Sequence, residues 1–96
     1  MVMDRRPTHP GEVLRDELEA RKMSANRLAL DLGVPSGRIT EILNGRRSIT
    51  PDTAVRLALY WGGKPQFWLN LQAGHDLARL ERDKGEEIRR QVRAAG

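Results

Sequence analysis

Residues 24–45, SANRLALDLGVPSGRITEILNG, decide the fold. Ser24 is a typical helix N-cap, because its hydroxyl can accept a hydrogen bond from an N–H group of the first turn. Leu28 and Leu32 then fall on one face of the helix that follows, and this spacing predicts an inward apolar stripe. Gly33 predicts the end of that helix, since glycine readily adopts the left-handed conformation of a helix C-terminus.

A second short helix is predicted from Pro35 or Ser36 to Asn44, and Gly45 ends it. Its apolar residues recur at the spacing i, i+3, i+4, which places them on one helical face; they are Ile39, Ile42 and Leu43. Two helices joined by a short turn that contains glycine are typical of the DNA-binding helix-turn-helix. In that motif the second helix enters the major groove.

The residues left on the outer face of this second helix favour base recognition over a plain helical bundle. They are short or hydrogen-bonding, as contact with base edges requires; they are Ser36, Gly37, Arg38, Thr40 and Glu41. Serine, glycine and threonine are mediocre helix formers for a surface that only meets water. Any helical bundle has capped amphipathic helices, so a protein-interaction module with an incidental basic face remains an alternative.

The rest of the chain predicts an all-α protein of five helical segments. The first segment opens at His9-Pro10-Gly11-Glu12, the fourth at Thr50-Pro51-Asp52, and the fifth near Lys64-Pro65. Proline suits the first turn of a helix, where N–H groups have no partner. We expect an N-terminal arm over residues 1–8, a helix-turn-helix domain over 9–80, and a charged tail over 81–96 that is either helical or frayed.

Composition limits the classes of function. The chain has 96 residues, a formal net charge of +4 and no cysteine, so disulfide scaffolds and thiolate chemistry are excluded. An excess of basic over acidic residues suits binding to a polyanionic partner. The N-terminus predicts no signal peptide and no segment predicts a membrane span, so we expect a cytoplasmic protein. His9 and His75 lack metal-ligand spacing and no nucleophile accompanies them, so we expect no metal, no cofactor and no enzyme.

The helix-turn-helix and its flanks together resemble a known family. Residues 24–35 and 38–47 resemble the Xre/Cro-type, lambda-repressor-like helix-turn-helix. Three flanking segments resemble HigA-family (VapI-like) addiction-module antitoxins: His9-Pro10-Gly11-Glu12, Ile49-Thr50-Pro51-Asp52-Thr53-Ala54, and Phe67-Trp68-Leu69-Asn70-Leu71-Gln72. The resemblance covers about residues 8–80. It implies a dimeric antitoxin that represses its own operon at double-stranded operator DNA and neutralises a HigB-like, RelE-fold mRNA-cleaving toxin. A stand-alone Xre regulator without a toxin is the alternative.

The predicted DNA contacts divide into base readers and phosphate contacts. Arg38 can pair with guanine or hold a phosphate, and Glu41 can accept from cytosine or form an ion pair with Arg38 three residues away. Ser36 and Thr40 can contact a base or a phosphate, whereas Gly37 has no side chain with which to read a base. Phosphate contact is expected from the first turn of the earlier helix and from the loop after the second, at Asn26, Arg27, Asn44, Arg46 and Arg47.

The aromatic residues near the start of the fifth segment are expected in the core or in an interface. Trp61, Phe67 and Trp68 can bury much of the apolar area of so small a chain. The apolar residues between Phe67 and Leu80 exceed what one small core can cover. We therefore expect a homodimer interface that includes Phe67, Trp68 and Leu71, with the first helix as the alternative.

Overall fold

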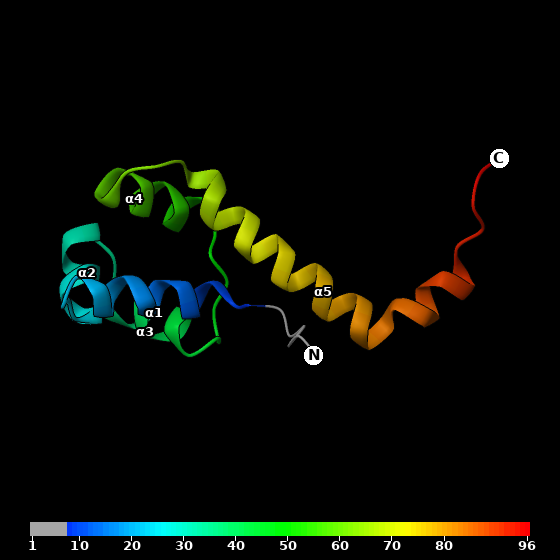
Figure 1. Cartoon of the computed structure of the whole chain (residues 1–96), viewed down its shortest axis with the longest axis horizontal. Helices are drawn as coiled ribbons and strands as arrows, with labels where there is room; N and C mark the ends of the chain where they lie inside the picture. The colour runs from blue at the N-terminus through cyan, green and yellow to red at the C-terminus, as the bar shows by residue number, and fades with distance from the viewer. Residues whose placement is uncertain (1–7) are drawn as a thin grey trace, which may run out of the picture.

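The computed structural model describes residues 8–96, which form five α-helices and no β-strand (Figure 1). The helices are α1 (Pro10–Ala20), α2 (Ala25–Leu32), α3 (Ser36–Leu43), α4 (Pro51–Trp61) and α5 (Pro65–Gln91). The predicted all-α, five-helix class is therefore confirmed for this part of the chain. Of the arm predicted over residues 1–8, all but Thr8 lies outside the described residues.

Three of the helices start at side chains that cap them. The Oγ atom of Ser24 accepts from the N–H of Arg27 at 3.0 Å, and Oγ1 of Thr50 accepts from the N–H of Thr53 at 3.4 Å. The start of α1 has a cap that the sequence analysis did not predict: Nδ1 of His9 accepts from the N–H of Gly11 at 2.9 Å. Glu12 completes a capping box by accepting from the N–H of His9 at 3.2 Å.

The core lies between α1, α2 and α3 on one side and α4 with the start of α5 on the other. Its fully buried large residues come from four helices; they are Leu14, Leu28, Ile39, Ile42 and Leu57. The N-terminal end of α1 packs closely on α3, because a Cβ atom at Gly11 would lie only 2.1 Å from the carbonyl oxygen of Ile42. The recognition helix predicted by the sequence is thus packed against α1 as well as α2.

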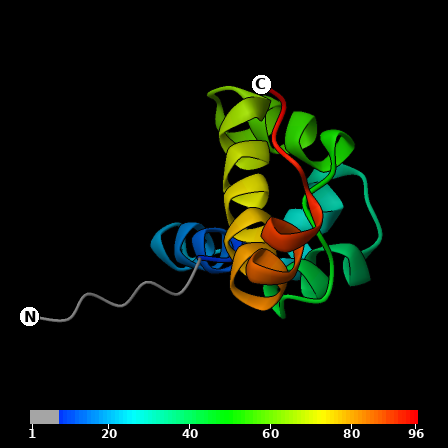
Figure 2. The same cartoon turned by 90° about the vertical axis from the view of Figure 1, so that its right-hand side faces the viewer.

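Helix α5 extends well beyond the other four helices (Figure 1), and Figure 2, viewed from that end, shows its yellow and orange part in front of them. It continues to Gln91, so residues 81–91 of the predicted tail are helical here and residues 92–96 have no regular structure. Figure 1 shows its axis changing direction in the orange part of the ribbon, before the C-terminal end. None of the described helices is both long enough and apolar enough to cross a membrane.

Candidate nucleic-acid interface

Helices α2 and α3 form the predicted helix-turn-helix. Gly33 ends α2 in the left-handed conformation, with φ of 73°, and the N–H of Val34 returns to the carbonyl oxygen of Ala29 at 3.0 Å. This closure turns the chain sharply into α3. Ile39 and Ile42 are fully buried under α3, so the helix has one face in the core and the opposite face in solvent.

The predicted contact residues lie on three consecutive pieces of this motif. Those on the first turn of α2 are Asn26 and Arg27; those on α3 are Ser36, Gly37, Arg38, Thr40 and Glu41; those on the loop after α3 are Asn44, Arg46 and Arg47. All are exposed except Arg38, whose side chain is 29% exposed. The hydroxyl of Thr40 donates to the carbonyl oxygen of Ser36 at 3.2 Å, which fixes its rotamer and turns its methyl group away from that bond.

Arg38 is held by a carboxylate on the next helix. Its NH1 atom lies 2.7 Å from Oδ2 of Asp52, in the first turn of α4. The same oxygen accepts from Nε of Arg56 at 3.0 Å, and NH1 of Arg56 donates to the carbonyl oxygen of Leu32 at 2.8 Å. Hydrogen bonds from Arg56 and then Arg38 lower the pKa of Asp52 below its ordinary value. This network connects the end of α2, the start of α4 and the recognition helix α3.

Glu41 pairs with Arg47, so the predicted alternative of an ion pair with Arg38 is wrong. Its Oε1 atom lies 2.8 Å from Nε and 2.7 Å from NH2 of Arg47. Arg38 is paired instead with Asp52, on the next helix. This ion pair connects α3 to the loop that follows it. Both side chains lie at the surface and are about half exposed.

Arg27 is placed by a second network. Its Nε atom lies 3.2 Å from the carboxylate of Asp31, one turn further along α2. The hydroxyl of Tyr60 on α4 donates to Oδ2 of Asp31 at 2.5 Å. The hydrogen bond from Tyr60, followed by that from Arg27, lowers the pKa of Asp31. The same bond raises the pKa of the Tyr60 hydroxyl, because it stabilises the protonated phenol.

Sequence reasoning missed the residues that hold these arginines. Asp52 was recognised only as a helix-start signal, and Asp31, Arg56 and Tyr60 were not singled out. The spacing of Arg27 and Asp31, four residues apart in a predicted helix, is a signal that could have found one pair. The contact between Arg38 and Asp52 depends on how α3 and α4 cross, which no local pattern encodes. The arrangement presents arginine donors and a hydroxyl at fixed positions, as recognition of phosphates and base edges requires.

The residues predicted for a dimer interface divide between core and surface. Trp68 is only 5% exposed and belongs to the core, so its indole is not free for a partner. Phe67 is 52% exposed, and Leu71 is partly buried against the core. The ring centroids of Trp61 and Trp68 lie 6.4 Å apart, which places both tryptophans in one aromatic cluster. The role of Trp68 as a partner contact is therefore corrected to that of a core residue.

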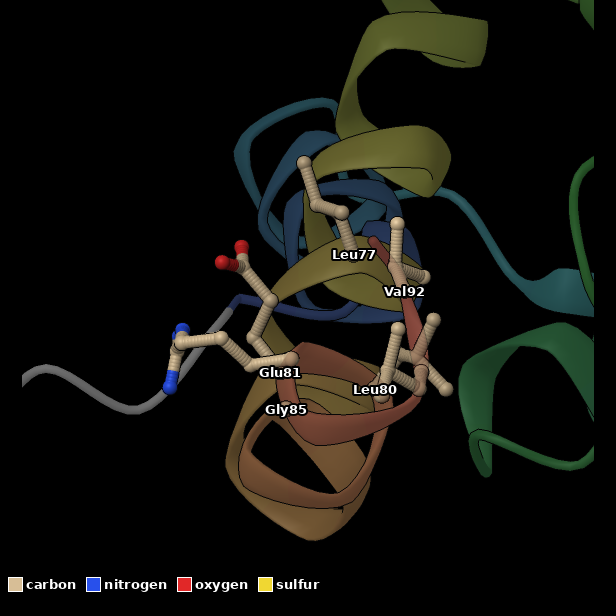
Figure 3. Close-up of a pocket in the computed structure, with 7 residues that line it drawn as sticks. Leu77, Leu80, Glu81, Gly85 and Val92 are labelled. Atoms are coloured by element: carbon tan, nitrogen blue, oxygen red, sulfur yellow. The ribbon is translucent and has the colours of Figure 1, made fainter. Parts of the chain in front are cut away.

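The later part of α5 and the residue that follows it carry further exposed apolar side chains. Leu77, Leu80, Ile88 and Val92 are exposed large hydrophobic residues, and together with Glu81, Gly85 and Arg89 they line a shallow apolar groove along the helix. Figure 3 shows Leu77, Leu80 and Val92 among the side chains that line this groove. The groove is on the part of α5 that extends beyond the core, and we refer to it as the α5 groove.

The two histidines, distant in sequence, lie together in the structure. The ring centroids of His9 and His75 are 4.8 Å apart in an edge-to-face arrangement. Burial, followed by the charge of His75, lowers the pKa of His9. In the part of the chain that the structure describes, no group of three or more histidine, cysteine or acidic side chains could hold a metal ion.

The fold and the exposed face of α3 define a helix-turn-helix protein of the DNA-binding class. The helix-turn-helix family model matches residues 14–68. Virulence-associated protein I of Dichelobacter nodosus is 51% identical over 77 residues, which are 79% of this chain and 71% of that protein. An addiction module antidote protein of the HigA family from Coxiella burnetii is 50% identical, with a TM-score of 0.90 over 94% of this chain and 99% of that one.

A further solved structure is that of the Pseudomonas aeruginosa antitoxin HigA with the higBA promoter. It is 37% identical to this chain, with a TM-score of 0.90 over 95% of this chain and all of that one. The chain belongs to the HigA (VapI-like) family of helix-turn-helix antitoxins. This is a non-enzymatic family of DNA-binding proteins.

Proposed function

We propose that this chain is the antitoxin of a type II toxin–antitoxin module and represses its own operon. One observation carries the proposal: α3 presents an exposed polar face backed by buried Ile39 and Ile42, on a chain that is similar to an antitoxin solved with its promoter. On this proposal α3 enters the major groove, and the N-terminal end of α2 lies against the neighbouring phosphates. Occupation of the operator then blocks transcription.

The contacts of the arginines support a division of roles along the motif. Arg38 is oriented by Asp52 and partly buried, so it enters the groove in one defined geometry and reads a base or the adjacent phosphate. The side chains of Arg27 and Arg47 are more exposed than that of Arg38, and each is paired with a carboxylate near it in the chain. We assign these two, with Asn26, Asn44 and Arg46, to the phosphate backbone. Ser36, Thr40 and Glu41 are assigned to base edges, and Gly37 to close approach of the backbone.

The assembly that binds an operator is proposed to be a homodimer formed across the α5 groove. The pattern of the groove is nearly symmetric about Gly85, with Leu77 and Leu80 before it and Ile88 and Val92 after it. Glu81 and Arg89 lie four residues on either side. Two copies of α5 crossing antiparallel at Gly85 would bury the four apolar side chains and place each Glu81 beside the Arg89 of the other copy. Such self-complementarity is what a two-fold interface requires.

Dimerisation is tested by a charge exchange at this groove. E81R and R89E each place like charges opposite each other twice, so each single variant is expected to weaken the dimer in sedimentation equilibrium. The double variant E81R/R89E restores opposite charges and should recover wild-type dimerisation. K64A, at the distant start of α5, is the control. Equal dimerisation by all variants would exclude this interface.

Operator binding is tested with DNA from the region upstream of the gene. Wild-type protein is expected to shift this DNA at about 100 mM salt, and the double variant R38A/T40A should lose the shift while its far-UV circular dichroism is unchanged. K64A is again the control, since Lys64 is exposed and lies outside the helix-turn-helix. Unchanged affinity of R38A/T40A would contradict the assignment of α3 as the recognition helix.

The proposed toxin partner is tested by the genes that neighbour this one. A small neighbouring reading frame is expected to encode a HigB/RelE-like toxin that arrests growth when expressed alone. Co-expression of this chain should relieve the arrest, and the two proteins should co-purify. Operator binding without any such partner would leave the alternative function, a stand-alone Xre-family regulator.

A further inference from the structure

A small polar cavity of about 150 Å³ lies beside the loop that follows α3. Three segments of the chain meet there: the N-terminal end of α1, the loop over residues 45–48, and the middle of α5. The side chains that matter below are His9, Arg46, Gln72, His75, Asp76 and Arg79. Two of these are arginines and two are histidines, whereas one is acidic. The cavity therefore joins the proposed phosphate-contacting loop to α5.

Two buried contacts hold the walls of this cavity in place. Oε1 of Gln72, a side chain that is only 6% exposed, accepts from the N–H of Ile49 at 2.7 Å. This bond ties α5 to the residue that directly follows the loop. Near His9, which lines the cavity, the close packing of Gly11 on the carbonyl of Ile42 fixes the start of α1 against α3. The cavity is therefore formed by the folded domain itself and does not depend on flexible side chains alone.

The cavity offers hydrogen-bond donors that nothing in the described chain accepts. The Nδ1 atom of His75 is buried and has no hydrogen-bond partner. Nδ1 of His9 accepts from the N–H of Gly11, so the neutral ring carries its proton on Nε2, where it can donate. Among the described residues, neither Arg46 nor Arg79 forms an ion pair with an acidic side chain. The donors of His9 and the two arginines fit a ligand that accepts hydrogen bonds, beside the buried and unpaired Nδ1 of His75.

The acidic residue of the cavity, Asp76, is hydrogen-bonded within α5. Oδ1 of Asp76 accepts from Nε2 of Gln72 at 3.0 Å, which directs that carboxylate oxygen toward α5. Arg47 also borders the cavity, and the carboxylate of Glu41 offsets its charge. The two arginines, Arg46 and Arg79, outnumber the one carboxylate, that of Asp76, so the net formal charge of these cavity residues is positive. The chemistry therefore favours a small anion with several acceptor oxygens.

We propose that this cavity binds a phosphate group, and that in the operator complex this group is a phosphodiester of the DNA backbone beside the loop after α3. This inference rests on the proposed operator binding. It adds His75 and Arg79, both on α5, to a DNA interface otherwise built from α2, α3 and their loops. Helix α5 also carries the proposed dimer groove. The same helix would therefore set the distance between the two subunits and contact the operator, whose half-sites lie at a fixed distance.

The test compares R79A with R82A, a neighbouring arginine of α5 that does not line the cavity. Operator affinity is measured by fluorescence anisotropy over a range of salt concentrations. Each lost phosphate contact lowers the slope of log affinity against log salt by about 0.9, so a dimer of R79A should lose about 1.8. R82A should keep the wild-type slope. D76N, which removes the opposing charge but keeps an acceptor oxygen for Gln72, should bind the operator more tightly.

A second measurement identifies the source of the phosphate. The side-chain nitrogen resonances of His75 are followed by NMR while operator DNA, or inorganic phosphate alone, is added. Shifts with operator together with the reduced slope of R79A support the DNA backbone as the source. Shifts with inorganic phosphate and a wild-type slope for R79A support a free anion and overturn the DNA assignment. If the His75 resonances shift in neither titration, the proposed site is wrong. If the wild type binds no operator at all, it is the proposed function that is refuted.

Discussion

Replacing Gly11 with alanine tests the close packing of α1 on α3. Gly11 is the second residue of α1, where alanine is normally the better helix former by up to about 1 kcal/mol. Here the added Cβ would lie 2.1 Å from the carbonyl oxygen of Ile42. Non-bonded heavy atoms need roughly 3.5 Å, so the two helices must separate by about 1.4 Å. The oxygen belongs to the backbone and cannot rotate away.

The size of the effect follows from these opposing terms. Overpacking a well-packed site costs about 1–3 kcal/mol, and a backbone obstacle places G11A near the upper end. Subtracting the gain in helix propensity leaves a net loss of about 2 kcal/mol. For a domain of this size that lowers the melting temperature by about 8–16 °C. Alanine retains the N–H that His9 accepts, although its Cβ would also lie 3.0 Å from Nδ1 of His9.

Gly37 provides a matched control for this prediction. It is the second residue of α3, and a Cβ atom there would meet nothing within 4 Å. G37A should therefore gain up to about 1 kcal/mol, a rise of roughly 4–8 °C. Both variants are melted by circular dichroism without DNA and at one protein concentration, since association shifts the melting temperature. Melting of G11A at or above the wild-type temperature would refute the packing argument.

Three further changes test the caps and the buried amide. T50A removes the N-cap of α4 and should lower the free energy of unfolding in urea by about 1 kcal/mol. Q72L leaves the buried N–H of Ile49 without an acceptor and should lower it by about 1–3 kcal/mol, whereas a leucine tolerated without loss would show that this bond is dispensable. The pKa of His9 is lowered on folding from 6.5, so the unfolded chain binds more protons and stability should fall as the pH drops below about 6.5. H9S keeps a capping oxygen that does not titrate, so its urea midpoint should vary less between pH 7 and pH 5 than that of the wild type.

Local signals predicted the helices and the motif. Ser24 and Thr50 cap the helices that they were expected to cap, because N-capping depends on residues within one turn. The cap at His9 was missed, since imidazole is not among the usual capping groups, although Glu12 three residues later has the spacing of a capping box. The fold class followed from periodicity and glycine turns, which are equally local.

Contacts between distant residues could not be predicted in the same way. Arg38 meets Asp52 only because α4 crosses beside α3, and His9 meets His75 only because α5 passes the start of α1. Trp68 was assigned to core or interface, and its burial depends on the angle at which α5 leaves α4. These outcomes depend on tertiary packing, which hydrophobic periodicity constrains but does not determine.

The pairing of arginines with carboxylates around α3 has a consequence for selectivity among DNA sequences. Asp52 and Glu41 occupy the guanidinium groups of Arg38 and Arg47 in the free protein, much as phosphates would. Binding any duplex through these arginines is then an exchange of anionic partners, with a smaller net gain than a count of arginines suggests. A random sequence must make the same exchange without base contacts to offset it. On the proposed operator binding, these carboxylates lower the affinity for any duplex, so only a sequence whose base contacts offset the exchange is bound tightly.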